Sequence, residues 1–337
     1  MPNSVTVTVA SGLNDTRFGK LQAPLASYIR QFGGIQKPEE ELWGKVFKEK
    51  QSTHWGEAYG SQTYIDDMVP VGEGGDYPST AFQDGYDKVI ANVEFKQSMR
   101  ISLTAIEDNV LGNLKQEADK LARAYHRGKA RLAAAYVGMS LQGQTSYSLK
   151  GWTFDLTCMD KGCVFSTAHA PKVHGASQSN LYADAFSADA LIAAKLKMQQ
   201  LKDEDGNTMG INPDTIIIPT YSPTLYKAVL AAVGSPQVTG SGNNDVSLNF
   251  GNWTVLVSSY LNDFVNQSAA NAPWILFDSR FNAEADGNIC QQRVPFNVRS
   301  ELAPNDDNVW KARARYGFGF VNWRQMMAFG VTGGSSL

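Results

Sequence analysis

The sequence predicts an α+β fold, because helical and strand-like patterns occupy different stretches of the chain. Three observations carry this prediction: a helical pattern over about 105–137, a strand-like alternation over 88–103, and a run of predicted helices and strands over 187–289. Residues 290–337 return to strand patterns. With 337 residues, the chain is long enough for two domains or for one large domain.

A long amphipathic helix is predicted from about Ala105 to about Val137, a length of roughly 50 Å. Thr104 and Glu107 fit a capping box at its start, and Gly138 is the expected stop. It is either a core helix with one solvated face or a spine that carries two smaller domains. Its apolar stripe contains Ile106, Val110, Leu114, Ala118, Leu121, Tyr125, Leu132 and Tyr136, and its polar face contains Lys115, Glu117, Asp119, Lys120, Arg123, Arg127, Lys129 and Arg131.

A long hairpin is predicted ahead of this helix. Between Lys88 and Leu103, apolar residues fall on odd positions almost throughout, which is the two-residue period of a strand. Residues 63–71 form a second strand candidate, and residues 71–78 between them are rich in turn residues. A two-stranded hairpin is marginally stable alone, so it folds onto its own sheet or lies on a neighbouring subunit. The candidate contact residues at its tip and base are Gly72, Glu73, Gly74, Asp76, Tyr77 and Lys88.

Residues 187–289 are expected to form a compact α/β unit. Ser187 is a candidate N-cap for a helix whose stripe is Leu191, Ala194, Met198 and Leu201. Proline follows Ser222 at the first position of a second helix, which carries Leu225, Val229 and Leu230. Residues 215–218, 253–261 and 274–277 are expected strands, and the polar segment 234–245 is an expected mobile loop.

The last 48 residues are predicted to form two strands with one apolar face each. Lys311, Arg313 and Arg315 lie opposite the second apolar face, and like charges at every second position need acidic partners or phosphates. Ion pairs across a sheet or subunit boundary are favoured over DNA contact. Gly317 and Gly319 suggest a close backbone approach or a bulge. The apolar positions are Val294, Phe296, Val298 and Leu302, then Trp310, Ala312, Ala314, Tyr316, Phe318 and Phe320.

Composition is that of an ordinary folded protein. Hydrophobic residues make up 43% and charged residues 19%, and the net charge of −3 does not indicate a broad nucleic-acid surface. Three cysteines form no disulfide framework and fit a reducing cytoplasm. The first ten residues do not resemble a signal peptide, and no run of 18 apolar residues predicts a membrane span.

One cluster has the residue types of a metal site: Cys158, Cys163, His169 and His174. Two thiolates and two imidazoles suit tetrahedral zinc, but the spacing departs from the usual paired-cysteine turn. The alternative is reduced cysteines and loop histidines without metal, which we favour. Sequence motifs for nucleophilic, phosphate-binding or nucleotide-binding sites do not occur, so we expect no catalytic residues, no cofactor and no enzyme.

The chain contains five segments, residues 165–171, 212–219, 255–261, 274–278 and 312–320, that in their order resemble the major capsid protein of tailed bacteriophages. Residues 165–171, FSTAHAP, are similar to the F-S-T-x-H-P stretch of Mu-type major head subunits, with an alanine inserted before the proline. Residues 212–219, 255–261 and 274–278 resemble strands of the family's axial domain, and residues 312–320 resemble its closing peripheral strand. The shared order covers roughly residues 50–330.

The resemblance implies an HK97-type capsid fold: an N-terminal arm (1–50), an extended E-loop (51–100), a P-domain with a spine helix (101–186), an A-domain (187–289) and returning P-domain strands (290–337). It also implies pentamers and hexamers closing an icosahedral shell around double-stranded DNA, in a virion assembled in the host bacterial cytoplasm. We expect partners to be further copies of the chain, a separate scaffolding protein, a portal and weakly held DNA, but no membrane. Alternatives are an encapsulin-like nanocompartment shell and a zinc-dependent enzyme.

Overall fold

The computed structural model describes residues 40–62, 68–77, 79, 84–102, 111–171, 176–203, 206–234, 249–267, 271–305 and 307–337. The chain divides into two compact units. Unit 1 comprises residues 1–40, 92–129 and 292–316, and unit 2 comprises residues 41–91, 130–291 and 317–337. Each unit is therefore built from segments that are far apart in the sequence.

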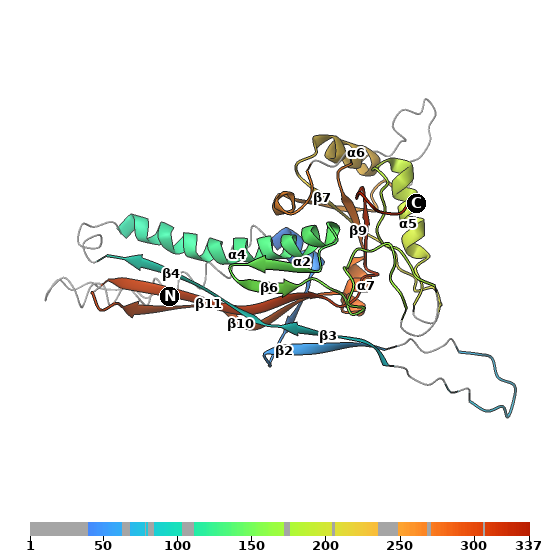
Figure 1. Ribbon diagram of the computed structural model, residues 1–337, viewed down its shortest axis with the longest axis horizontal. Coiled ribbons are helices and arrows are strands. Elements are labelled where there is room, and N and C mark those ends of the chain that lie inside the picture. The colour runs from blue at the N-terminus through green and yellow to red at the C-terminus, as the bar shows by residue number, and fades with distance from the viewer. Residues whose placement is uncertain are drawn as a thin grey trace, which may run out of the picture. The chain divides into compact units, whose positions relative to one another are not determined.

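In unit 1, a helix lies along one face of a β-sheet (Figure 1). The helix is the first part of α4 (Leu111–Leu141), and the strands are β4 (Val93–Ile101) with most of β10 (Asn288–Leu302) and β11 (Asn308–Phe320). β11 lies between β10 and β4, and it pairs antiparallel with β4, so that Trp310 is opposite Met99.

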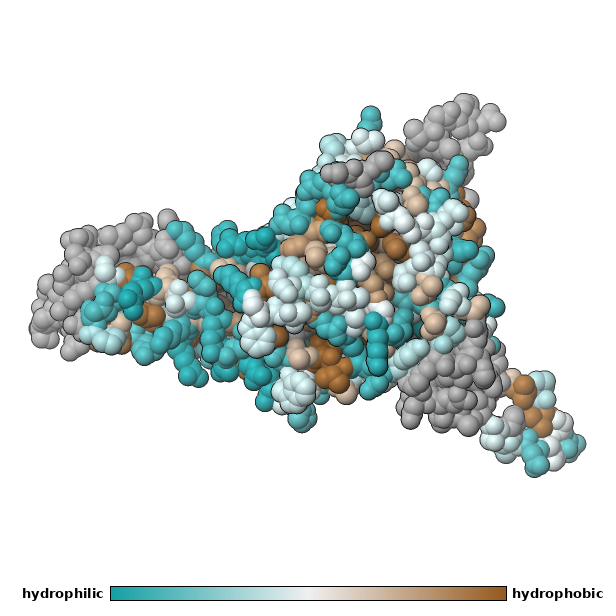
Figure 2. All heavy atoms as spheres, viewed as in Figure 1, coloured by the Kyte–Doolittle hydropathy of each residue, from teal (hydrophilic) through white to brown (hydrophobic). Residues whose placement is uncertain are grey.

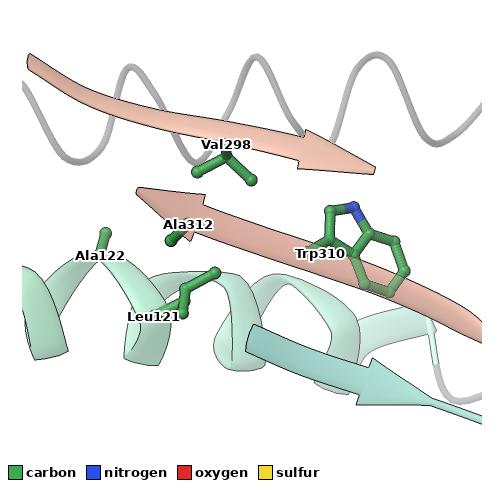
Figure 3. Packing of buried hydrophobic residues seen from close by; sticks show 5 residues of the cluster. All are labelled: Leu121, Ala122, Val298, Trp310 and Ala312. Carbon is green, nitrogen blue, oxygen red and sulfur yellow. The ribbon is translucent and has the colours of Figure 1, made fainter. Parts of the chain in front are cut away.

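The core of unit 1 forms where α4 meets the sheet. Leu121 and Ala122 of α4 pack against Val298 of β10 and against Trp310 and Ala312 of β11 (Figure 3). Trp310 is fully buried, and Met99, Ile101 and Phe296 pack around the cluster. Each large side chain buried in this way contributes about 1.5–3 kcal/mol, which fixes the even positions of β11 toward the helix.

The long helix is confirmed, with corrections at one end and on one face. Residues 103–110, which include the predicted capping box, lie outside the described residues. The predicted stop at Gly138 is wrong, since α4 continues to Leu141. A Cβ at Gly138 would lie 2.5 Å from Cβ of Phe264, so this glycine serves close packing. Lys129 was expected in solvent but is buried, donating a hydrogen bond to Oε1 of Gln292 at 3.1 Å.

The predicted strand over 88–103 divides at Asn92 into β3 (Asp84–Ala91) and β4. β3 pairs antiparallel with β2 (Gly56–Gln62), whereas β4 pairs with β11. The predicted alternation holds in β4 but is inverted in β3, where Lys88 and Ile90 are buried and Val89 is exposed. A change of strand partner allows this change of face. The second strand predicted for the hairpin, residues 63–71, is not the strand that pairs with β3. Residues 68–71 are not in a strand, and residues 63–67 lie outside the described part.

Unit 2 contains a four-stranded sheet in the order β12-β9-β7-β8. The strands are β7 (Thr215–Pro219), β8 (Thr254–Ser258), β9 (Trp274–Phe277) and β12 (Met326–Phe329). β7 pairs in parallel with β8 and antiparallel with β9. Every residue of β7, β9 and β12 is buried, which explains their continuous apolar sequences.

Two helices lie beside this sheet (Figure 1), and both were predicted. In α5 (Ala188–Gln199), Oγ of Ser187 accepts a hydrogen bond from the backbone N–H of Ala190 at 3.0 Å, as an N-cap should. The four residues of its predicted stripe are buried. In α6 (Pro223–Gly234), Leu225 and Val229 are buried, but Leu230 is exposed. The loop predicted after α6 lies mostly outside the described residues.

Shorter elements complete unit 2: α2 (Glu40–Val46), β1 (Lys48–Gln51), β5 (Ser146–Leu149), β6 (Trp152–Asp155), the 3₁₀ helix η1 (Tyr260–Asp263) and α7 (Ser279–Glu284). β5 and β6 form a hairpin. Within the described part of the chain, no helix combines the length and apolar character that a membrane crossing requires.

Candidate assembly surfaces

The tip of the predicted hairpin presents apolar side chains directly to solvent. Met68 and Tyr77 are 101% and 98% exposed, and Val69 and Val71 are about half exposed. Hydrophobic atoms are visible on the surface of this segment at the lower right of Figure 2. The backbone turns where the N–H of Gly75 donates to the carbonyl of Gly72 at 3.0 Å. We call residues 68–77 the tip segment.

The turn in the tip segment depends on glycine. Gly74 has a φ of +79°, the left-handed value that the third position of a type II turn requires. Glu73 and Asp76 flank it, and both are exposed together with Gly72 and Tyr77. The predicted tip residues therefore lie together on one exposed stretch of chain that contains this turn.

Lys88, at the base of the hairpin, is held inside its own chain. Its side chain is buried, and Nζ donates to Oδ2 of Asp155 and, at 2.6 Å, to Oγ1 of Thr157. Burial alone would raise the pKa of Asp155, but the hydrogen bonds from Lys88 and Thr157 outweigh it and lower the pKa. This geometry gives Lys88 an intrachain role, so we leave it out of the proposed contact surface.

The basic residues of β11 lie on the solvent side of the unit 1 sheet, opposite the α4 core. Lys311 is paired with Glu301 of β10, and Arg313 is paired with Glu94 of β4. Glu94 also accepts a hydrogen bond from Lys96, with Nζ and Oε2 2.7 Å apart, and these contacts with Lys96 and Arg313 lower its pKa. The acidic partners expected from the sequence are therefore present.

A groove of about 590 Å³ runs across this solvent side, and we call it the basic groove. It is lined by four cationic side chains, by polar residues and by two small apolar ones: Lys96, Gln97, Ser98, Val294, Asn297, Arg299, Lys311, Ala312 and Arg313. Arg315 lies opposite Glu94 in the strand register and extends the same side along β11. Sequence reasoning found the β11 cations but missed Lys96 and Arg299, because strand pairing alone brings the three strands together.

Two glycines of β11 allow close backbone approach within unit 2, as the sequence predicted. A Cβ at Gly317 would lie 2.4 Å from the carbonyl oxygen of Ala91, and one at Gly319 would lie 2.4 Å from Cδ1 of Ile90. A larger side chain at Gly317 would clash with the backbone of Ala91, and one at Gly319 would displace the side chain of Ile90. The base of the hairpin is therefore positioned by these two glycines.

The candidate zinc residues do not form a metal-like cluster where they are described. His174 is outside the described residues, and no group of three histidine, cysteine or acidic side chains there is placed to hold a metal. Sγ of Cys163 donates to the carbonyl of Ser140 at 3.1 Å. Burial, reinforced by the charge of Asp160, raises the pKa of Cys158, which disfavours the thiolate that zinc requires.

His169 is instead the centre of a buried hydrogen-bond network. Its Nδ1 lies 2.6 Å from Oδ2 of Asp160, and its Nε2 lies 3.1 Å from Oδ1 of Asn180. The same Asn180 oxygen accepts from the backbone N–H of Ser166, and its amide donates to the carbonyl of Val164 at 2.7 Å. Both ring nitrogens therefore have a hydrogen-bond partner within the chain, which leaves neither for a metal.

The network also holds the segment around His169 against the residues that precede β12. The His169 ring stacks on Trp323 with 4.1 Å between centroids and 6° between planes, and Arg324 lies over the same indole. Burial alone would raise the pKa of Asp160, but the hydrogen bond and charge of His169 lower it. The sequence identified His169 but gave no signal for its partners, since Asp160 and Asn180 follow no recognisable motif and Trp323 comes from a distant segment.

Comparisons with solved structures identify the fold. The capsid of Ralstonia phage GP4 matches with a TM-score of 0.51 and 8% identity over 88% of this chain and 92% of that chain. The capsid of an empty GTA particle matches with a TM-score of 0.51 and 12% identity over 88% and 90%. Mycobacterium phage Patience matches with a TM-score of 0.50 and 8% identity over 98% and 96%. The fold is the predicted HK97-type α+β capsid fold.

A family model described as phage capsid protein matches residues 86–328. This match covers well over half of the chain, so the chain belongs to the phage capsid protein family. The predicted tailed-phage capsid function is confirmed at this level, and the encapsulin-like alternative is not preferred. A search of curated proteins finds no match. The closer similarity to Mu-type head subunits remains a prediction from the FSTAHAP stretch.

Proposed function

We propose that this chain assembles with further copies of itself as pentamers and hexamers that close an icosahedral shell around double-stranded DNA. The family match supports the capsid role, and the exposed apolar side chains of the tip segment support contact between subunits. The side chains of Met68 and Tyr77 are not buried by their own chain, whereas contact with a neighbouring subunit would remove both from water. The capsid role also accounts for the absence of a recognisable catalytic motif in the sequence.

Each part of the chain has its own role in such a shell. Residues 1–50 act as an arm, 51–100 as the E-loop, 101–186 and 290–337 as the P-domain, and 187–289 as the A-domain. A separate scaffolding protein and a portal would act with it during assembly in the host bacterial cytoplasm, and the mature product would be the virion capsid. The net charge of −3 supports weak contact with packaged DNA.

The decisive experiment is negative-stain microscopy with light scattering on the recombinant chain, alone and with its scaffolding protein. We expect closed particles or five- and six-membered rings. Deleting residues 72–79 should leave the two units folded but abolish closed shells, because the deletion removes the turn and Tyr77. A chain that stays monomeric with scaffold supplied would contradict the proposal, and normal shells from the deletion variant would remove the tip segment from it.

A further inference from the structure

The charges of this chain are unevenly distributed, and one stretch of α4 carries only positive ones. Residues 120–131 contain no aspartate or glutamate and five cations, Lys120, Arg123, Arg127, Lys129 and Arg131. This stretch therefore contributes +5, while the whole chain carries −3. The next acidic residue along the chain is Asp155, which lies beyond the end of the helix. The middle of α4 is a local positive region on a weakly acidic protein.

Three of these cations form a row on the solvent side of the helix. Lys120, Arg123 and Arg127 are exposed, and their spacing of three and four residues places them on one side of α4. Leu121 and Ala122 are directed the other way and pack against the sheet of unit 1 (Figure 3). We call Lys120, Arg123 and Arg127 the basic row.

The other two cations of the stretch are engaged within their own chain. Lys129 is buried and donates a hydrogen bond to Oε1 of Gln292. Arg131 is paired with Asp263, with 3.1 Å between Nη2 and Oδ2. We therefore leave both out of the basic row.

The surroundings of the basic row fit a phosphate backbone better than a protein partner. Ala124 and Gly128 are the small residues beside the row, and a Cβ at Gly128 would meet nothing within 4 Å. Where the structure describes the side chains of α4, none of its large apolar ones is exposed, whereas protein interfaces are anchored by large side chains such as tryptophan and tyrosine. A phosphate backbone needs only cations, and small neighbours allow it to approach the helix closely.

The length of the basic row also fits one strand of duplex DNA. From residue 120 to residue 127 an α-helix rises roughly 10 Å. One DNA strand carries a phosphate for about every 3.4 Å of axis, so a row of this length spans about three phosphates. Three cations therefore face about three phosphates, which is few enough for the weak contact that the net charge of the chain favours.

From this match we infer that the basic row of α4 is the site at which this chain contacts the phosphate backbone of packaged duplex DNA. The inference rests on the proposed shell function and adds to it the surface that meets the DNA. It places the solvent side of α4 toward the inside of the shell. Contacts of this kind do not depend on base sequence and weaken as salt rises, so the DNA is held without being fixed in one register.

Neutralising the basic row tests this inference. Variant A carries Lys120→Gln, Arg123→Gln and Arg127→Gln, and glutamine keeps a good helix propensity at each position. A short fluorescein-labelled duplex should bind the wild-type chain at low salt, as measured by anisotropy. Three phosphate contacts predict that this affinity falls about 40-fold between 50 mM and 200 mM salt. We expect variant A to bind the duplex at least tenfold more weakly and to lose most of this salt dependence.

A matched control makes the same change of net charge on the other side of unit 1. Variant B carries Lys96→Gln, Arg299→Gln and Lys311→Gln in the basic groove, where Glu94 and Glu301 already compensate part of the charge. It should bind the duplex like the wild type. Thermal unfolding followed by circular dichroism checks that both variants remain folded. Unchanged binding by variant A, or an equal loss in variant B, would overturn the inference.

Particle formation separates this inference from the shell proposal. Variant A should form shells like the wild type by light scattering and microscopy, because the basic row is not needed for contact between subunits. If wild-type chains form no particles even with scaffold, the shell proposal fails whatever the duplex does. If variant A binds the duplex normally but no longer binds its scaffolding protein, the basic row docks an acidic protein segment and the inference is wrong.

Discussion

The tip segment and the sheet of unit 2 use apolar residues in opposite ways. In β7 and β9, every side chain is buried by neighbouring strands and helices of the same chain. In the tip segment, Met68 and Tyr77 are as exposed as in an extended chain. Apolar residues therefore occur in two settings here: a core that the chain buries by itself, and a surface that only another molecule could bury. Substitutions distinguish the two by whether stability or assembly changes.

The largest effect on stability is expected for Trp310→Ala in the unit 1 core. The indole on β11 is fully buried against Leu121 and Ala122 of α4 and Val298 of β10, and truncating such a side chain costs about 3–5 kcal/mol. Urea unfolding of the full chain measures this loss. Trp152→Ala is the matched control, because Trp152 is 60% exposed and its truncation should cost under about 0.5 kcal/mol. Equal losses would mean that the cluster in Figure 3 is not a core.

Two glycines of α4 should respond to alanine with opposite signs. Gly138→Ala places a methyl group 2.5 Å from Cβ of Phe264 and should destabilise by about 1–3 kcal/mol. Gly128→Ala meets nothing within 4 Å and should stabilise the helix by up to about 1 kcal/mol. Thermal unfolding of both variants checks this contrast. A stabilising Gly138→Ala would show that the close approach of Phe264 does not constrain this position.

The sequence predicts features that depend on residues close together in the chain, but it does not predict those that depend on distant contacts. Local rules predicted α5 with its Ser187 cap, the buried strand β7 and the alternating face of β11, because each depends on near neighbours in the chain. They misplaced the helix end at Gly138 and the solvent face at Lys129, because Phe264, Gln292 and Tyr316 decide those environments. Contacts with distant residues override local preference at both positions.

The candidate surfaces divide in the same way. The tip segment was predictable from its turn residues, and the β11 cations from their spacing of two. The basic groove was not, since Lys96 and Arg299 join those cations only through strand pairing. The inverted face of β3 was also hidden, because the alternation of residues continues through Asn92 while the strand changes partner.

A smaller and pH-dependent effect is expected at the His169 network. The lowered pKa of Asp160 means that its carboxylate stabilises the fold above its ordinary pKa of about 3.9, and that this contribution disappears as pH falls through the lower folded value. The stability gap between wild type and Asp160→Asn should therefore be largest near pH 7 and should narrow below about pH 4. Urea unfolding across this range measures the gap.

Asp263→Asn provides the comparison for this pH effect. Asp263 pairs with Arg131 at 3.1 Å, but both side chains are about half exposed, so the pair should contribute at most about 1 kcal/mol at any pH. A gap for Asp160→Asn that does not change with pH would show that the carboxylate charge is unimportant. The network would then act through packing of His169 on Trp323 alone.

The smallest effect on stability, and the sharpest test of the comparison, is expected for Met68→Ala combined with Tyr77→Ala. Both side chains are fully exposed in the isolated chain, so the free energy of unfolding should change by less than about 0.5 kcal/mol. Loss of particles by light scattering, with unchanged unfolding, would assign their apolar surface to contact between subunits. Normal particles would mean that assembly does not need these two side chains, and the exposed apolar residues of the tip segment would then have no role that sets them apart from other exposed residues.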